Sequence, residues 1–198
     1  MAGGRGGAPR AGVAGLLLTG GRSRRMGADK ASLVVGGRRL AETVGERLGD
    51  VAAPVLEVGP GRSGLRSVAE DPPGEGPLVA LVSGWRALVD LGHDGAVLVL
   101  ACDLPLVTVE VLRLLAAWPG PGSAVPVVGG LRQPLCARWA PADLGRAAAA
   151  AGGGARSLKR CFGPDVSLLD ESVWATVAPV TVFADVDTPA DLERLGLA

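Results

Sequence analysis

The chain has 198 residues, of which 48% are hydrophobic, and its 20 lysines and arginines balance its 20 aspartates and glutamates. This composition describes one domain of ordinary size with enough apolar side chains for a core, and the zero net charge argues against nucleic acid as a partner. A single histidine and three cysteines without a C-x-x-C pair exclude H-E-x-x-H metalloproteases and indicate neither a structural zinc site nor a disulfide framework, which fits a reducing cytoplasm.

The amino-terminal end and the longest apolar stretch predict neither a leader nor a membrane anchor. Residues 1–12 are expected to form a disordered tail before a single domain at 13–198. The apolar run 13–18 is too short for a secretory signal. Charged residues interrupt the stretch 78–107 well short of the ~20 apolar residues that a membrane span needs, so we expect no contact with a membrane.

From residue 13 onward, short apolar runs alternate with helical patterns. The run 96–102 is the most apolar and is typical of a buried parallel strand, with Asp103 at its end. In the segment 40–48, apolar residues recur every fourth position on one helix face. Strands are expected at 13–18, 55–58, 68–69, 96–102, 124–128, 134–139 and 180–183. Helices are expected at 40–48, 78–89, 109–118, 141–151 and from Thr188 through Leu195.

This alternation of strands and helices predicts the fold class. We expect a single-domain α/β fold of three layers, with a doubly wound and mostly parallel sheet. In such sheets, ligands bind beyond the carboxyl ends of the strands. The loops after Leu18 and Cys102 are therefore the first candidates for a functional site, and both loops carry charged residues.

The first of these loops, residues 19–30, combines glycines with arginines and ends at Lys30. Glycine lets backbone N–H groups approach phosphate oxygens, and arginine and lysine neutralise those oxygens, so the loop is typical of a triphosphate cradle. It is not a P-loop, because no G-K-[ST] closes it. A basic surface turn is the alternative that the residues leave open, since glycine and arginine are abundant throughout the chain.

A second glycine pattern follows the strand expected at 55–58. Residues 59–64 spell G-x-G-x-x-G, the formal pyrophosphate fingerprint of dinucleotide enzymes. That fingerprint requires a full helix after the loop, whereas Pro72-Pro73 end the segment early. Because a glycine-rich chain generates such spacings often, we do not expect a dinucleotide site here.

The first loop also carries a longer motif. Residues 18–30 read Leu-Thr-Gly-Gly-Arg-Ser-Arg-Arg-Met-Gly-Ala-Asp-Lys, which resembles, without a gap, the signature L-x-G-G-x-S-x-R-M-G-x-D-K of the molybdenum cofactor guanylyltransferases, a nucleotidyltransferase family. Further blocks follow in the family's order: Glu70-Asp71 with Gly76-Pro77-Leu78, Cys102-Asp103-Leu104-Pro105, Gln133-Pro134-Leu135, and Val186-Asp187-Thr188-Pro189-Ala190-Asp191-Leu192. The resemblance spans nearly the whole chain and implies a Rossmann-like nucleotidyltransferase fold.

The resemblance also implies a reaction and its site. Such an enzyme transfers GMP from GTP to the phosphate of molybdopterin, the pterin of the molybdenum cofactor, and releases pyrophosphate with Mg²⁺ as cofactor. Molybdoenzymes or their chaperones are implied as protein partners. Catalytic roles fall on Arg25, Lys30 and Asp103, and metal ligation falls on Asp103 and Asp187. Nucleotide contacts are implied for Leu18, Thr19, Gly20, Gly21, Lys30, Asp71, Gly76, Pro77, Leu78 and Asp103.

Each acidic residue of this set also has a structural interpretation. Asp103 precedes Leu-Pro at a strand end, where an aspartate often caps the next helix or bonds to its own turn. Asp71 stands before two prolines, as in a solvated turn. Asp187 precedes Thr-Pro, with Asp191 following, as at an ordinary helix start with an acidic first turn. The resemblance favours the functional interpretation of all three.

The chain departs from the family pattern at two positions. The guanylyltransferases usually have an asparagine near the end of the second strand, where this chain has Val58 followed by Gly59-Pro60. We therefore expect recognition of the base or ribose to differ. Thr19 stands where the family commonly has alanine, although a backbone cradle accepts either side chain.

Two rival functions stay open. A related cytidylyltransferase, acting on molybdopterin or on a small phosphorylated alcohol, has the same loop, although Gly20-Gly21 favours guanine because the cytidylyl relatives more often carry Ala-Gly. The rival of another class is a catalytically silent nucleotide-binding protein. Such a protein is expected to have lost Arg25, Lys30 or Asp103, all of which this chain retains.

Overall fold

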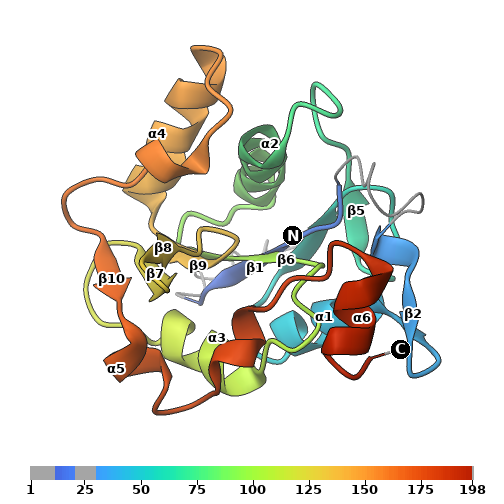
Figure 1. Cartoon of the computed structure of the whole chain (residues 1–198). Helices are drawn as coiled ribbons and strands as arrows, with labels where there is room; N and C mark the ends of the chain where they lie inside the picture. The colour runs from blue at the N-terminus through green and yellow to red at the C-terminus, as the bar shows by residue number, and fades with distance from the viewer. Residues whose placement is uncertain (1–11, 21–29, 198) are drawn as a thin grey trace, which may run out of the picture.

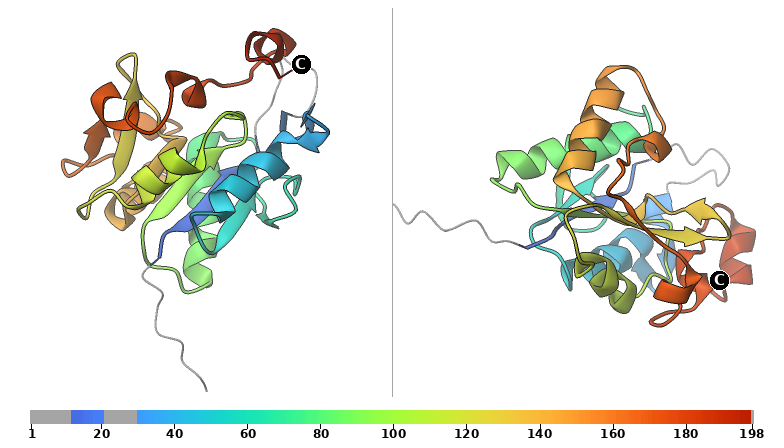
Figure 2. Two further views of the ribbon diagram at one scale, coloured as in Figure 1. Left: turned by 90° about the horizontal axis from the view of Figure 1, so that it is seen from below. Right: turned by 90° about the vertical axis from the view of Figure 1, so that its left-hand side faces the viewer.

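The computed structural model describes residues 12–20 and 30–197, which form a three-layer α/β domain (Figure 1). A central sheet lies between two layers of helices, as the turned views show (Figure 2). The expected disordered tail, residues 1–12, lies outside the described ranges except for Gly12, and it stays a prediction.

Within these ranges, eight strands form the main sheet in the order β10-β7-β9-β6-β1-β4-β5, with β8 paired to β7. β1 pairs in parallel with β6 and β4, β4 with β5, and β7 with β10, while β9 runs antiparallel to both of its neighbours. The sheet is thus mostly parallel, as predicted. The strands are β1 Ala14–Leu18, β4 Val55–Val58, β5 Arg66–Val68, β6 Val97–Ala101, β7 Ala124–Val128, β8 Leu131–Arg132, β9 Cys136–Trp139 and β10 Ser167–Leu169, with a separate hairpin of β2 Val34–Val35 and β3 Arg38–Arg39.

The helices begin at residues suited to a first turn. Pro77 and Pro141 open α2 and α4, where a missing N–H costs nothing, and the Thr108 side chain caps α3. The helices are α1 Leu40–Gly49, α2 Pro77–Asp90, α3 Val109–Ala116, α4 Pro141–Gly152, α5 Glu171–Trp174 and α6 Pro189–Arg194, with 3-10 helices η1 Lys30–Ser32, η2 Leu158–Arg160 and η3 Val180–Phe183. In the described part of the chain, no helix is long and apolar enough to cross a bilayer.

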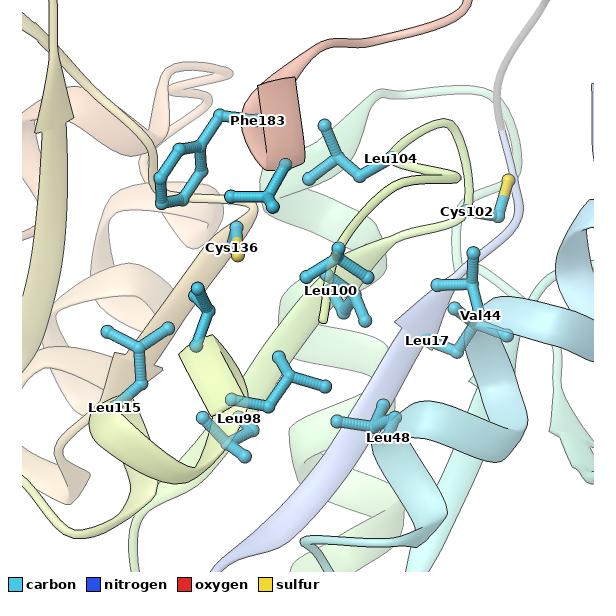
Figure 3. Close-up of a cluster of buried hydrophobic side chains, with 14 of the residues drawn as sticks. Leu17, Val44, Leu48, Leu98, Leu100, Cys102, Leu104, Leu115, Cys136 and Phe183 are labelled. Carbon is cyan, nitrogen blue, oxygen red and sulfur yellow. The ribbon is translucent and has the colours of Figure 1, made fainter. Parts of the chain in front are cut away.

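The central strands bury side chains on both faces of the sheet. Leu17 of β1 belongs to the cluster under α1 and α3, whereas Leu16 and Leu18 belong to the cluster under α2 and α4. Figure 3 shows Leu17 beside Val44 and Leu48 of α1. Because successive residues of a strand point to opposite faces, a strand covered by helices on both sides is apolar throughout, which explains the unbroken apolar runs of the sequence.

Helix α2 packs closely on the sheet. A Cβ on Gly84 would lie 2.5 Å from Val58 Cγ2 and 2.8 Å from Leu16 Cδ2, so the close approach requires glycine. The helix starts at Pro77, at the carboxyl edge of the parallel strands. Its tight packing therefore fixes the turn that precedes it at this edge.

The segment 180–183 corrects the sequence analysis. It is expected as a strand but forms η3. Val182 and Phe183 are both buried while the two residues before them are exposed, a pattern that the alternating faces of a strand do not produce. Phe183 packs edge-on against Trp174 of α5, with ring centroids 5.1 Å apart. The sheet edge beside β7 is taken by β10, which the sequence analysis did not identify.

Candidate functional site

Three strands end side by side at the carboxyl edge of the sheet. Leu18, the last residue of β1, pairs with Ala101 at the end of β6 and with Val58 at the end of β4. The pairing continues beyond the strands, because the Cys102 N–H donates to the Leu18 carbonyl at 3.1 Å. The loops after β1, β4 and β6 therefore start from one place, where a doubly wound sheet binds its ligand.

The signature loop begins as a buried continuation of β1. Leu18 and Thr19 are each 5% exposed, so the nucleotide contact predicted at Leu18 falls on its backbone and not on its side chain. The N–H groups of Thr19 and Gly20 both donate to the Val58 carbonyl, at 3.0 and 3.2 Å. These bonds attach the start of the loop to β4, and phosphate-binding amides are therefore expected later in the loop.

The cationic part of the loop is described only at its end. Gly21 and Arg25 lie outside the described residues, in the stretch 21–29. Lys30 is the first residue of η1, which contacts α1, and the next residue, Ala31, is fully buried. The backbone of Lys30 is thereby held beside the core, and the phosphate contacts of this part of the loop stay predictions.

Asp103 and Asp187 come together through the backbone. Both residues are half-buried, and the Val186 N–H donates to the Asp103 carbonyl oxygen at 2.9 Å. Val186 is itself fully buried, which holds the segment before α6 against the loop after β6. The two aspartates therefore lie at the same edge of the sheet, while the approach of their carboxylates to one another stays a prediction.

Helix α6 is capped by Thr188 and Asp191. The Thr188 side chain accepts from the Asp191 N–H, and the Asp191 carboxylate accepts from the N–H groups of Thr188 and Asp187 at 2.8 and 3.0 Å. Hydrogen bonds from the Arg194 and Thr188 side chains and from the backbone hold the pKa of Asp191 well below its ordinary value. The acidic cap at this helix start is therefore Asp191, and Asp187 lies before it.

Arg47 of α1 holds the loop that carries Asp103. Its guanidinium donates to the carbonyl oxygens of Pro105 and Val107, the latter at 3.0 Å. These bonds tie the loop after β6 to a helix on one face of the sheet. Arg47 is not predicted from the sequence, because its position is that of any arginine on an amphipathic helix.

The side chains of Asp103 and Asp187 suit a magnesium ion. Mg²⁺ prefers oxygen ligands and is usually bound through one or two carboxylates together with waters and substrate phosphates. Within residues 12–20 and 30–197, no three His, Cys, Asp or Glu side chains gather to hold a metal ion by themselves. Two aspartates at the edge where a triphosphate is expected therefore fit a metal that the substrate helps to bind.

The loop between β5 and α2 lies beside the start of the signature loop. Glu70 accepts from the N–H groups of Gly74 and Gly76 at 2.9 and 3.0 Å, which fixes the turn before α2. Its Oε2 also lies 3.8 Å from the position of a Cβ on Gly20, so this loop approaches the signature loop. Glu70 belongs to a motif of the sequence but has no predicted role there. The sequence pattern that could have indicated the role of Glu70 is an acidic residue followed closely by two glycines with free backbone N–H donors for its carboxylate.

The predicted nucleotide contacts on this loop differ in exposure. Asp71 is exposed, and its N–H donates to the Ser83 hydroxyl at 3.1 Å. Gly76 is half-buried at the start of α2, and Pro77 is exposed. Leu78 is fully buried in the core, so only its backbone is available to a ligand.

The glycine pattern at 59–64 folds around a carboxylate of the protein itself. Glu57 of β4 is fully buried and accepts, at 2.8 Å each, from the N–H groups of Gly61, Arg62 and Ser63. A dinucleotide fingerprint uses such amides to hold pyrophosphate. Because Glu57 occupies these amides and strand β5 follows in place of a helix, the structure excludes a dinucleotide site here, as expected.

Two hydroxyl groups complete the surroundings of Glu57. Thr19 Oγ1 donates to it at 2.6 Å and Ser63 Oγ at 2.5 Å. Burial raises the pKa of Glu57, but the hydrogen bonds from Ser63, Thr19 and the backbone together outweigh burial and leave the pKa below its ordinary value. Glu57 is thus held as a carboxylate. This role of Glu57 is not among the predictions from the sequence, although an acid inside an otherwise apolar strand, followed by a loop rich in N–H donors, is a usable signal.

Comparisons with known proteins identify the family of the chain. Residues 15–166 match a family model described as the MobA-like NTP transferase domain. A protein of Pelotomaculum thermopropionicum named "Probable molybdenum cofactor guanylyltransferase" is 34% identical over 189 residues, which cover 91% of this chain and 90% of that protein. A "Molybdenum cofactor guanylyltransferase" of Cereibacter sphaeroides is 40% identical over 133 residues, which cover 63% of this chain and 67% of that protein.

Two solved structures share the fold. Molybdopterin-guanine dinucleotide biosynthesis protein A from Archaeoglobus fulgidus has a TM-score of 0.76 at 22% identity, covering 92% of this chain and 96% of that one. The 2-C-methyl-D-erythritol 4-phosphate cytidylyltransferase from Thermus thermophilus has a TM-score of 0.61 at 24% identity, covering 92% and 97%. At these identities the likeness concerns the fold.

Fold, site and matches together define an α/β nucleotidyltransferase. The matched family domain covers most of the chain. The Pelotomaculum protein and this chain match over nearly the full length of both. The chain belongs to the MobA-like NTP transferase family. The resemblance read from the signature loop is thereby confirmed.

Proposed function

We propose that this chain transfers GMP from GTP to the phosphate of molybdopterin and releases pyrophosphate. The observation that carries the proposal is the meeting of the signature loop with Asp103 and Asp187 at one edge of the sheet. Relatives that match 91% and 63% of the chain are named molybdenum cofactor guanylyltransferases, which supports the choice of donor and acceptor.

In this reaction an oxygen of the molybdopterin phosphate attacks the α-phosphorus of GTP. A new P–O bond forms while the bond from the α-phosphorus to the oxygen bridging the β-phosphate breaks, and pyrophosphate leaves with that oxygen. Negative charge grows on the leaving group, so cations placed beside it accelerate the step. We assign this role to Arg25 and Lys30, and catalysis then consists mainly of positioning and charge stabilisation.

We assign Mg²⁺ to Asp103 and Asp187. When bound there, the ion would stabilise the negative charge of the triphosphate oxygens and of the departing pyrophosphate. The chain contributes the placement of both carboxylates: Arg47 holds the loop after β6, and the Val186 N–H holds the Asp103 backbone.

We assign the remaining nucleotide contacts to the backbone of the signature loop and to the turn before α2. Leu18, Thr19, Gly20 and Gly21 supply the first set, and Asp71, Gly76, Pro77 and Leu78 supply the second. Glu70 supports this assignment, because it fixes the turn and approaches Gly20. Guanine is preferred in this proposal because discrimination among bases requires hydrogen bonds to the base edge.

A cytidylyltransferase acting on molybdopterin or on a small phosphorylated alcohol is the second candidate. Gly59 keeps this candidate open, because the position after Val58 carries no side chain that reads the edge of a guanine base. The common fold with a cytidylyltransferase is compatible with both candidates.

We place the reaction in the cytoplasm, in a domain spanning residues 13–198 after a disordered tail at 1–12. All three cysteines are described, and they are buried and form no disulfide, as suits a reducing compartment. Molybdoenzymes or their chaperones receive the product in this proposal.

Pyrophosphate release from each of the four nucleoside triphosphates, with and without molybdopterin, tests the proposal. We expect release from GTP alone among the four, only with molybdopterin and Mg²⁺ present. Release with CTP in place of GTP favours the second candidate. Tight nucleotide binding without release under any of these conditions favours the catalytically silent protein.

A further inference from the structure

The two departures from the family pattern lie against each other. A Cβ on Gly59 would fall 2.2 Å from Thr19 Oγ1 and 2.9 Å from the Gly20 nitrogen, and Gly59 has a φ of +147°. A residue with a side chain therefore does not fit at position 59 while Thr19 keeps its place. Thr19 keeps its place because its hydroxyl donates to Glu57 at 2.6 Å. The threonine and the glycine thus belong to one arrangement, and Glu57 is its centre.

Glu57 joins two loops through a single carboxylate. Thr19, on one side, begins the signature loop, and the N–H groups of Gly61, Arg62 and Ser63, on the other, belong to the loop after β4. The carboxylate is fully buried, so water does not replace these bonds. Removing the acceptor leaves several donors unpaired at once, which is more costly than losing one exposed hydrogen bond.

The order of the strands determines which part of a nucleotide this arrangement faces. β1 lies between β6 and β4. Asp103 follows β6, so a triphosphate that extends from the signature loop toward Asp103 lies on one side of β1. The nucleoside end of the same molecule then lies on the other side, above β4, where the loop 59–64 begins.

We propose that Glu57 is a positioning residue for the nucleoside end of the substrate. Its carboxylate fixes Thr19 and the backbone of residues 61–63, and the loop 59–64 thereby becomes a preorganised wall beside the ribose and base. Glu57 does not touch the nucleotide and acts through this loop. The inference rests on the proposed nucleotidyl transfer, but it does not depend on which base the enzyme prefers.

Glu57→Gln and Thr19→Val test this role. Glutamine keeps the size of the side chain but turns an N–H₂ group toward backbone N–H donors, and valine removes the hydroxyl of Thr19. We expect each variant to raise KM for the preferred nucleotide about tenfold, with kcat changed less than about threefold. The ratio of kcat/KM between the preferred nucleotide and its nearest competitor is expected to fall about tenfold. Dissociation constants from calorimetry are expected to change in parallel.

Asp143→Asn is the matched control. Asp143 is also a buried carboxylate with several partners, since it accepts from Ser123 Oγ at 2.6 Å, from Arg146 at 2.8 Å and from the Gly163 N–H at 2.9 Å. Ser123 directly precedes β7, at the amino edge of the parallel strands, opposite the site. We expect this variant to lower Tm without changing the ratio between nucleotides.

The outcomes separate this inference from the proposed function. A wild-type enzyme that prefers another nucleotide contradicts guanylyl transfer, but the same variants still test Glu57 with that nucleotide. The inference is overturned if the Glu57→Gln variant folds and its KM, its dissociation constants and its ratio between nucleotides all stay within twofold of wild type. If Glu57→Gln does not fold, the same result for Thr19→Val overturns the inference. A wild-type chain that binds no nucleoside triphosphate overturns both.

Discussion

The backbone N–H of Val186 donates to the carbonyl oxygen of Asp103 at 2.9 Å, and this bond joins the carboxy-terminal segment to the end of the central strand. The two residues are far apart in sequence, yet the bond makes the segment before α6 a neighbour of the loop after β6. Asp187 follows Val186 directly. The edge of the sheet thus holds two aspartates whose placement depends on backbone bonds and on the burial of Val186.

Asp103→Ala is expected to abolish turnover without unfolding the protein. If Asp103 binds Mg²⁺, its loss removes charge stabilisation worth several kcal/mol, and the rate of pyrophosphate release falls by about a thousandfold or more. Because the side chain is half-buried in a loop that Arg47 also holds, we expect Tm to change by only a few degrees. Asp94→Ala, in the exposed turn before β6, is the control and keeps the wild-type rate. Near wild-type release by Asp103→Ala would contradict the metal role.

Asp187 and Asp191 separate metal binding from helix capping. Asp187→Ala is expected to raise the Mg²⁺ concentration for half-maximal rate, while Asp187→Asn has a mild effect because the resembled family often has asparagine there. Asp191→Ala removes the acceptor at the start of α6 and is expected to lower Tm, with the Mg²⁺ dependence unchanged. Magnesium titrations of the rate and melting curves distinguish the two. A lower Tm with an unchanged Mg²⁺ requirement in Asp187→Ala would make Asp187 structural.

Most of the fold is predictable from the sequence because the strands are buried on both faces. Strands such as β1 and β6 are continuous apolar runs, and helices such as α1 repeat with the helical period, so neither requires knowledge of distant contacts. The segment 180–183 is rich in apolar and β-branched residues, yet Phe183 packs against Trp174 and the segment forms a 3-10 helix. Its conformation depends on a tertiary contact that a short run does not encode.

Part of the candidate site is also predictable from the sequence, and part of it is not. Asp103 and Asp187 belong to motifs, and strand order alone brings Asp103 to the expected edge. Glu57 and Glu70 have no predicted role because each accepts from backbone N–H groups a few residues later in the chain, a local pattern without an established motif. Arg47 donates to a loop that only the folded chain brings near. Acceptors and donors of this kind are visible in the sequence only as charges in unexpected places.

Lys30 is compared best with the only other lysine of the chain, Lys159. Lys30→Ala, like Arg25→Ala, is expected to lower kcat by about a hundredfold and to raise KM for GTP much less, because the charge that it stabilises develops in the transition state. Lys159→Ala, on the exposed side of η2, keeps both constants. Steady-state kinetics with GTP measure the difference. An unchanged kcat with a raised KM in Lys30→Ala would indicate uniform binding and not catalysis.

The base preference is a separate prediction from the transfer chemistry. GTP is expected to bind at least about tenfold more tightly than CTP in calorimetry, because hydrogen bonds to a base edge distinguish purines from pyrimidines strongly. Position 59 is a glycine and offers no side chain for recognising the base. The hydrogen bonds to the base edge therefore have to come from the backbone of the signature loop and of the turn before α2. Tighter binding of CTP than of GTP would contradict this prediction and support the cytidylyltransferase as the function.

Glu57 gives the protein a stability that depends on pH. Its pKa is lower in the folded chain than its ordinary value of 4.5, so folding favours the carboxylate. The resulting stabilisation is fully present above pH ~4.5 and is lost as the pH falls through the lower, folded-state pKa. We expect wild type to exceed Glu57→Gln by about 1–3 kcal/mol in the free energy of unfolding at pH 7, and the difference to shrink below pH ~4.5. Urea unfolding at several pH values measures it, with Asp94→Asn as an exposed control. A difference that is constant with pH would show that the carboxylate's charge contributes nothing.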